Sequence, residues 1–161
     1  MGTSSNISFY DQKELEKVLE FHNKYRNIHG SPPLKLNDKL SQKAEKIVSQ
    51  MINDSKHNLY DSSISIYQNN PLGENIYINK EQKSPKEICQ AWYNENIKYK
   101  YKSDKFQKDA IHFTQIVWKN TKEVGFAFSK AKKICCGVAL YYPAGNIFDQ
   151  FKANVLEPEK K

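Results

Sequence analysis

Apolar residues repeat at helical spacing in two segments of the first third of the chain. The first segment opens with Asp11 and Glu14, a pair that resembles a capping box. One face of it then carries Leu15, Val18, Leu19, His22 and Tyr25. The second segment can be capped by Asn37 or Asp38, and its face carries Leu40, Ala44, Ile47, Val48 and Met51. These repeats predict a helix over residues 11–28 and another from residue 38 to just before His57.

Strand-like sequence appears later in the chain. Residues 72–78 alternate as a strand does, and residues 124–128 and 134–142 predict a hairpin joined by a lysine-rich turn. Between them, Ser84 and Glu87 mark the start of a helix that reaches Glu95, and Asp109 is the expected cap of a short helix or turn over residues 112–118. Helices first and strands later indicate the α+β class with an antiparallel sheet.

Four polar residues stand out because each lies among apolar neighbours or closes a structured element. Glu74 shares a strand face with two isoleucines, and Glu95 falls on the buried face of its helix. His112 heads an apolar segment that ends at Trp118, and His57 follows the second helix. Burial raises the pKa of a carboxyl unless an imidazolium, a hydrogen bond or a cation compensates. We therefore expect the four to converge in one cleft, where the imidazoles could hold a divalent metal such as zinc.

The charge balance adds a basic surface to this picture. The net charge is +7, from 25 basic and 18 acidic residues. The lysines concentrate at Lys98, Lys100, Lys102, Lys105, Lys108, Lys130, Lys132, Lys133, Lys160 and Lys161. Such a surface attracts anionic lipid head groups or nucleic acid, although a solvated face is the commoner reason for a lysine run. Nucleic acid is the weaker partner, because no recognised reading module accompanies the charge.

The cysteines bear on the compartment. Cys135 and Cys136 are neighbours on a predicted strand, so their side chains point to opposite faces, and Cys89 makes the total odd. No disulfide framework is expected, which favours a reducing compartment. The chain starts without a secretory signal, and its longest apolar run, residues 134–142, is far shorter than the ~20 residues of a spanning helix. We expect an intracellular protein, or a secreted one whose signal is missing from this sequence.

The first residues come close to a myristoylation pattern. That pattern needs Gly2 exposed after removal of Met1 and prefers Ser or Thr where this chain has Asn6. A single myristoyl chain binds membranes marginally, so the basic surface would act as a second signal. The alternative is a disordered leader in which Gly2 has no role. With no internal repeat, we expect a flexible leader over residues 1–11, one domain over 12–157 and a basic tail over 158–161.

Several motifs, in order along the chain, resemble those of the CAP superfamily of cysteine-rich secretory proteins, antigen 5 and plant pathogenesis-related proteins. They are His22-Asn23 with Arg26, Pro33-Leu34, Gly73-Glu74-Asn75-Ile76, Trp92-Tyr93-Asn94-Glu95 and His112-Phe113-Thr114-Gln115-Ile116-Val117-Trp118. The last is the most specific. The likeness extends from about residue 12 to residue 157. The disulfide-poor sequence and Gly2 look most like the intracellular, Golgi-associated branch of the family.

This resemblance implies an α-β-α sandwich with a central three-stranded antiparallel sheet between helices. It also implies that His57, Glu74, Glu95 and His112 form the cleft tetrad of the family, in which some members bind zinc through the two histidines. The chain departs from the family pattern at two points. Ile111 precedes His112 where the family usually has glycine, and the cysteine pairs of the secreted members are missing.

The first functional interpretation is a non-enzymatic, lipid-binding or membrane-associated protein. The resemblance implies sterols, fatty acids or acidic phospholipids as ligands, and an anionic membrane surface as partner. Tyr60, Tyr67 and Tyr77 are the aromatic residues that we expect to contact lipid in an apolar groove. The expected location is peripheral, on the cytosolic face of Golgi-like membranes. This interpretation best matches the charge, the missing secretion signal and the family branch together.

Two alternatives use the same tetrad. In a zinc-dependent, protease-like hydrolase, zinc at His57 and His112 would lower the pKa of a bound water, and Glu74 or Glu95 would act as general base. In a protein-interaction module, the tetrad would be a structural hydrogen-bonded network that fixes helices against the sheet. Self-association into a homodimer belongs to this second alternative.

Overall fold

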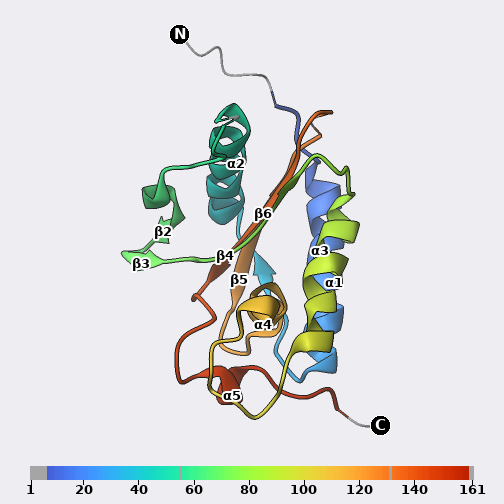
Figure 1. Ribbon diagram of the computed structural model, residues 1–161, viewed down its shortest axis with the longest axis vertical. Helices are drawn as coiled ribbons and strands as arrows, with labels where there is room; N and C mark the ends of the chain where they lie inside the picture. Colours follow the sequence, from blue (N-terminus) through green and yellow to red (C-terminus); the bar gives the residue numbers. More distant parts are fainter. Residues whose placement is uncertain (1–6, 55, 131, 160–161) are drawn as a thin grey trace.

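The molecule is built in three layers, with helices on both faces of a central sheet. The computed structural model describes residues 7–54, 56–130 and 132–159. The helices are α1 (Gln12–Ile28), α2 (Asp38–Asn53), α3 (Pro85–Tyr93), α4 (Ile111–Val117) and α5 (Phe151–Asn154). Helix α2 covers one face of the sheet, and α1, α3 and α4 lie on the other (Figure 1). The predicted α-β-α sandwich is confirmed. Gly2 and the last two lysines lie outside the described residues.

The sheet contains the three antiparallel strands that the sequence predicts, together with one short parallel strand. The strands are β1 (Lys35–Leu36), β4 (Gly73–Asn79), β5 (Glu123–Phe128) and β6 (Cys135–Tyr142). Their order is β1-β5-β6-β4, with β6 antiparallel to both of its neighbours and β1 parallel to β5. Strand β1 was not expected. It contains only two residues, shortly after a Pro-Pro pair, and two residues are too few to show the alternation of apolar and polar positions that marks a strand.

Three of the predicted helix starts are confirmed by their caps. The Asp11 carboxylate accepts the N–H of Glu14 at 3.1 Å, and the Asn37 side chain caps α2. Ser84 and Glu87 form the reciprocal capping box of α3. These side chains satisfy backbone N–H groups that a helix leaves unpaired at its first turn, so a local pattern is sufficient to locate the starts.

The helix ends differ from the prediction in two places. Helix α2 ends at Asn53, because the carboxylate of Asp54 turns back to accept the backbone N–H groups of His57 and Leu59 at 3.2 and 3.0 Å. Helix α3 ends at Tyr93, and a 3-10 helix, η2 (Asn94–Lys98), continues the chain. Glu95 therefore lies on η2 rather than on a long α3.

Two hydrophobic cores lie between the layers. The larger one joins α1, α3 and α4 to one face of the sheet, and the smaller one joins α2 to the other. Cys135 belongs to the larger core and Cys136 to the smaller, as neighbours on a strand should. Both are free thiols, as is Cys89. Gly125 lets α2 approach the sheet closely, since a Cβ there would lie 2.2 Å from the backbone nitrogen of Ser41.

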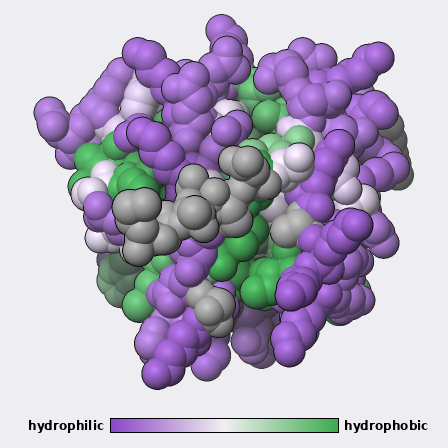
Figure 2. Space-filling view, turned by 90° about the horizontal axis from the view of Figure 1, so that it is seen from above, coloured by the Kyte–Doolittle hydropathy of each residue, from purple (hydrophilic) through white to green (hydrophobic). Residues whose placement is uncertain are grey.

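Shorter elements complete the chain. They are η1 (Ser62–Ser65), β2 (Ile66–Tyr67), β3 (Asn70–Pro71) and η3 (Lys108–Ala110). Residues assigned to the leader also join the fold, because Tyr10 donates its N–H to the carbonyl of Phe128 at 3.0 Å. Hydrophilic residues cover most of the face seen in Figure 2, with hydrophobic residues between them. None of the helices among the described residues has the length and apolar composition needed to cross a bilayer.

Candidate functional site

The site is built on α4, a short helix held by a dense core. Phe113, Ile116 and Trp118 are fully buried beneath it. The buried amide of Gln115 accepts the N–H of Gly145 at 2.9 Å and donates to Thr121 at 3.2 Å, which joins α4 to the loops beyond it. This apolar anchoring fixes the backbone at the residue that opens the helix, His112.

Glu95 binds the start of α4 and orients the imidazole of His112. Its Oε1 accepts the backbone N–H groups of His112 and Phe113 at 2.9 and 3.2 Å, and its Oε2 lies 2.7 Å from Nδ1 of the His112 ring. An ionised carboxylate only accepts, so Nδ1 carries the proton and Nε2 is left as the basic nitrogen. Trp92 stacks on the same ring, with the centroids 6.0 Å apart and the planes at 11°.

Glu95 also takes the role that we expected of Asp109. Helix α4 has no side-chain cap from its own sequence, and Asp109 lies in the preceding η3. The two N–H groups at the start of α4 are satisfied by a carboxylate from η2 instead. A negative charge at a helix N-terminus is favourable, so the expected local cap is unnecessary.

A neutral hydrogen-bonded chain lies behind His112, and the sequence did not predict it. Asn75 donates its amide to the carbonyl of His112 at 3.0 Å and to the hydroxyl of Tyr141 at 3.3 Å. The Tyr141 hydroxyl lies 2.7 Å from Nε2 of His22, whose Nδ1 donates to the carbonyl of Val18. Burial lowers the pKa of His22 to about 3 and raises that of Tyr141 far above its usual value. The polar residue Asn75, next to Glu74 on a strand, was the signal in the sequence that could have revealed this chain of hydrogen bonds.

Glu74 and His57 have partners of their own. The Tyr60 hydroxyl donates a hydrogen bond to the Glu74 carboxylate, and burial with this bond raises the pKa of Tyr60. The ring of His57 is 59% exposed and lies 3.8 Å from the carboxylate of Asp54. The backbone N–H groups of Leu59 and His57 donate hydrogen bonds to the Asp54 carboxylate and lower its pKa, with the larger effect from Leu59. Across the described parts of the chain, no hydrogen bond or ion pair links His57 to Glu74, Glu95 or His112.

The tetrad fits a metal only in part. His112 has the arrangement of a metal-binding histidine, with one ring nitrogen held by a carboxylate and the other available. Zinc sites in proteins normally use three or four protein ligands, however. Within residues 7–54, 56–130 and 132–159, no group of three or more His, Cys, Asp or Glu side chains is arranged to hold an ion. The described residues therefore supply fewer protein ligands than a usual zinc site, and zinc at His57 and His112 stays a prediction.

The tyrosines expected to line one groove lie on two faces of the sheet. Tyr60 and Tyr67 pack against the core on the α2 side, whereas Tyr77 packs against the core on the α1 side. Tyr67 contacts Tyr142 edge-to-face with ring centroids 5.1 Å apart. The Tyr77 hydroxyl donates to the carbonyl of Glu81 at 2.8 Å. These side chains do not form a common lipid surface.

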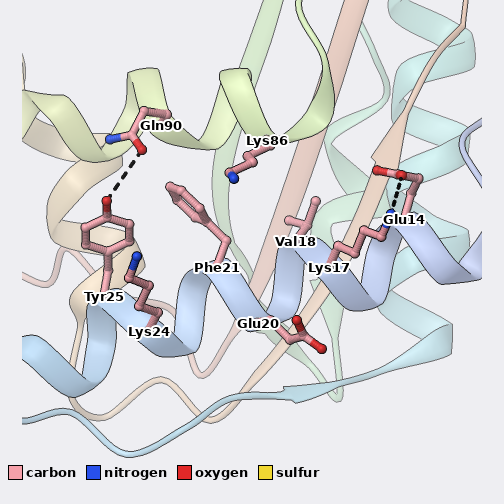
Figure 3. Close-up of a pocket in the computed structure, with 9 residues that line it drawn as sticks. All are labelled: Glu14, Lys17, Val18, Glu20, Phe21, Lys24, Tyr25, Lys86 and Gln90. Atoms are coloured by element: carbon pink, nitrogen blue, oxygen red, sulfur yellow. Dashed lines mark hydrogen bonds and ion pairs between the residues drawn. The ribbon is translucent and has the colours of Figure 1, made fainter.

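A groove of about 710 Å³ lies between α1 and α3. Its apolar side chains are Val18, Phe21 and Tyr25, and the last two point from α1 toward α3 (Figure 3). The Tyr25 hydroxyl donates to the side chain of Gln90 at 3.4 Å, which closes one end. Lys86 reaches from α3 toward Phe21, so the groove joins an apolar floor to a positive rim.

The fold and the motifs define the class of protein. Residues 19–141 match the family model described as CAP, Cysteine-rich secretory protein family. The chain belongs to this family, and the predicted membership is confirmed.

The comparisons also relate the chain to particular proteins. It is 34% identical to human Golgi-associated plant pathogenesis-related protein 1, across 99% of this chain and 100% of that protein. It is 31% identical to Repressed by EFG1 protein 1 of Candida albicans, across 93% of this chain but only 56% of that protein. A crystal structure of NaASP2 with Zn²⁺ has the same fold, with a TM-score of 0.69, 21% identity and coverage of 93% and 88% of the two chains.

Proposed function

We propose that this protein is a non-enzymatic CAP protein that binds anionic lipids and associates peripherally with membranes. The observation that carries the proposal is the groove between α1 and α3. Its volume of about 710 Å³ falls within the roughly 300–1,000 Å³ typical of small-molecule sites. An apolar floor under a rim of charges suits an amphiphile, which buries its acyl chain and leaves its head group at the rim.

The charges at the rim favour an anionic head group. Lys24 lies on α1 with its ammonium group 5.7 Å from the centre of the Tyr25 ring, and Lys86 lines the same groove from α3. Lys17 is engaged by Glu14 at 3.4 Å, so that pair leaves little net charge. Glu20 points away from α3 (Figure 3). A fatty-acid carboxylate or a phospholipid phosphate would meet Lys24 and Lys86.

The tetrad supports a structural role more than a catalytic one. The Glu95 carboxylate accepts two backbone N–H groups and the His112 ring, and the Glu74 carboxylate accepts the Tyr60 hydroxyl. A general base needs an oxygen within hydrogen-bond reach of the proton it removes. Both carboxylates already accept hydrogen bonds from protein groups, and no specific observation favours the hydrolase alternative.

The name of the relative and the charge of the chain support a location on Golgi-like membranes. The human relative is named as Golgi-associated, and we extend that association to this chain, on the cytosolic face. The net charge of +7 favours the anionic surface of that leaflet. Acylation at Gly2 would add a second anchor. Secretion remains the alternative, and fluorescence microscopy of the tagged protein in cells would distinguish the two.

The groove is tested by binding of a fluorescent fatty-acid probe. The Lys24→Glu, Lys86→Glu double variant should bind it at least tenfold more weakly than wild type, about 1.4 kcal/mol, because repulsion replaces attraction at the rim. A matched control, Lys39→Glu with Lys46→Glu, makes the same charge change on α2, across the sheet. No binding by wild type, or equal binding by both double variants, would contradict the proposal.

A further inference from the structure

Residues 98–102 alternate lysine and tyrosine, and the structure separates the two kinds of side chain. The rings of Tyr99 and Tyr101 pack inward against Phe113, with centroids 5.6 and 6.5 Å from that ring. The intervening Lys98 and Lys100 are exposed. The tyrosines therefore anchor the segment to the core, and the lysines face solvent as a consequence.

The segment is also fixed along its length. The side chain of Gln107 accepts the N–H of Lys100 and donates to its carbonyl, both at 2.9 Å, which closes the loop. Asp104 accepts the backbone N–H of Lys152 at 2.8 Å and ties the loop to α5. A surface held this firmly loses little conformational entropy when it binds a partner.

The exposed side of this loop forms a basic groove of about 590 Å³. Its charged side chains are Lys98, Lys100, Lys105, Lys108 and Asp109. Four ammonium groups against one carboxylate leave an excess of three positive charges. Lys102 pairs with Glu157 and Lys152 with Asp104, but in the described part of the chain none of the four groove lysines has such an ion pair.

Exposed aromatic side chains accompany the lysines. Phe106 lines the groove and is 55% exposed, with its ring 6.4 Å from that of Phe151 in α5. Phe148, in the segment leading to α5, is 72% exposed. The loop and α5 lie at the same end of the molecule (Figure 1). Lysines that meet phosphates and an aromatic ring that enters the boundary of the acyl chains are the features of an interfacial membrane contact.

We propose that the loop over residues 98–108, with Phe106 among its lysines, is the surface that docks the protein on an anionic bilayer. This inference rests on the proposed function, because it names the surface through which peripheral membrane association occurs. It is separate from the groove between α1 and α3, which takes a single lipid molecule. A bilayer is favoured over single-stranded nucleic acid, because the groove offers one aromatic ring and not a series on which successive bases stack.

Flotation of unacylated protein with phosphatidylcholine vesicles, with and without phosphatidylserine, tests the docking surface. Wild type should float with the anionic vesicles only, and added salt should release it. Lys100→Glu with Lys105→Glu should weaken binding at least tenfold, and Phe106→Ser, which leaves the charge unchanged, at least threefold. The α2 control, Lys39→Glu with Lys46→Glu, should weaken it less than twofold. Thermal melts and the fatty-acid probe report whether each variant is folded with an intact α1–α3 groove.

Each other outcome overturns the inference in a recognisable way. If wild type and the Lys100→Glu, Lys105→Glu variant float equally, the docking surface is elsewhere and the proposed function stands. If wild type binds the fatty-acid probe but no vesicle, membrane docking fails and lipid binding in the groove stands. If it binds neither, the inference and the proposed function fail together. If it binds a single-stranded oligonucleotide and no vesicle, the basic groove is a nucleic-acid site.

Discussion

Glu95 is the residue on which the arrangement of the site depends. One carboxylate caps α4 through two backbone N–H groups and fixes the tautomer of His112, whose ring Trp92 covers. The sequence could identify Glu95 and His112, because a charged group among apolar neighbours is visible locally. It could not identify Asn75 or Tyr141 as their support, since those hydrogen bonds join residues far apart in the chain.

Zinc binding by the two histidines is a prediction that calorimetry can check. The His57→Ala, His112→Ala double variant should bind Zn²⁺ roughly ten- to a hundredfold more weakly than wild type, because imidazole nitrogens are the ligands lost. Glu45→Gln, an exposed change on α2, is the control and should leave the affinity unchanged. Identical weak binding by wild type and the double variant would remove the metal site.

Arg26 joins helix α1 to several loops at once. Its guanidinium is fully buried and donates four hydrogen bonds of 2.8–2.9 Å, to the carbonyls of Pro32, Ile116, Trp118 and Thr121. Burial lowers its pKa to about 10, so the side chain is still charged at neutral pH. The charge is balanced by carbonyl dipoles rather than by a carboxylate, and the end of α4 is held against α1 as a result.

Replacing Arg26 by methionine should therefore be strongly destabilising. Four buried carbonyls would lose their donor, and we expect the free energy of unfolding to fall by about 3 kcal/mol or more. Urea denaturation followed by circular dichroism measures the change. Lys13→Met, an exposed substitution on the same helix, should alter stability by no more than about 0.5 kcal/mol. A loss below 1 kcal/mol for Arg26→Met would contradict this role.

The elements were predictable to the extent that their signals are local. The caps at Asp11, Asn37 and Ser84 and the hairpin β5-β6 follow from residues a few positions apart, and all are found. The end of α3 was misjudged, because η2 continues the helical pattern with different hydrogen bonds. Strand β1 forms only because β5 is available to pair with it, which no local pattern contains.

The stability of the whole molecule should depend on pH through its buried histidines. Burial lowers the pKa of His22 from 6.5 to about 3 and also lowers that of His29. The unfolded state therefore binds more protons below about pH 6.5, and stability is lost as the pH falls toward 3. For His22 alone the loss between pH 7 and pH 5 is about 2 kcal/mol.

Urea denaturation at a series of pH values measures this dependence. The His22→Gln variant should have a flatter profile between pH 7 and pH 5 than wild type, whatever its absolute stability. Parallel profiles for the two proteins would mean that His22 does not titrate as its burial requires.

Charge and shape together give the molecule two separate features for which we propose contact with lipid. One is the groove between α1 and α3, and the other is the lysine loop at the α5 end of the molecule. Glu95 and His112, at the start of α4, line neither of these features, and their hydrogen bonds serve the fold. Membrane association and lipid binding are thus compatible, in one small domain, with a tetrad whose side chains make structural hydrogen bonds.

The most direct test of this account is flotation of the unacylated wild-type protein with neutral and with phosphatidylserine-containing vesicles. The account predicts that the protein floats with the anionic vesicles, stays behind with the neutral ones and is released by salt. Equal recovery with both vesicles, or no recovery with either, would contradict peripheral binding to anionic membranes.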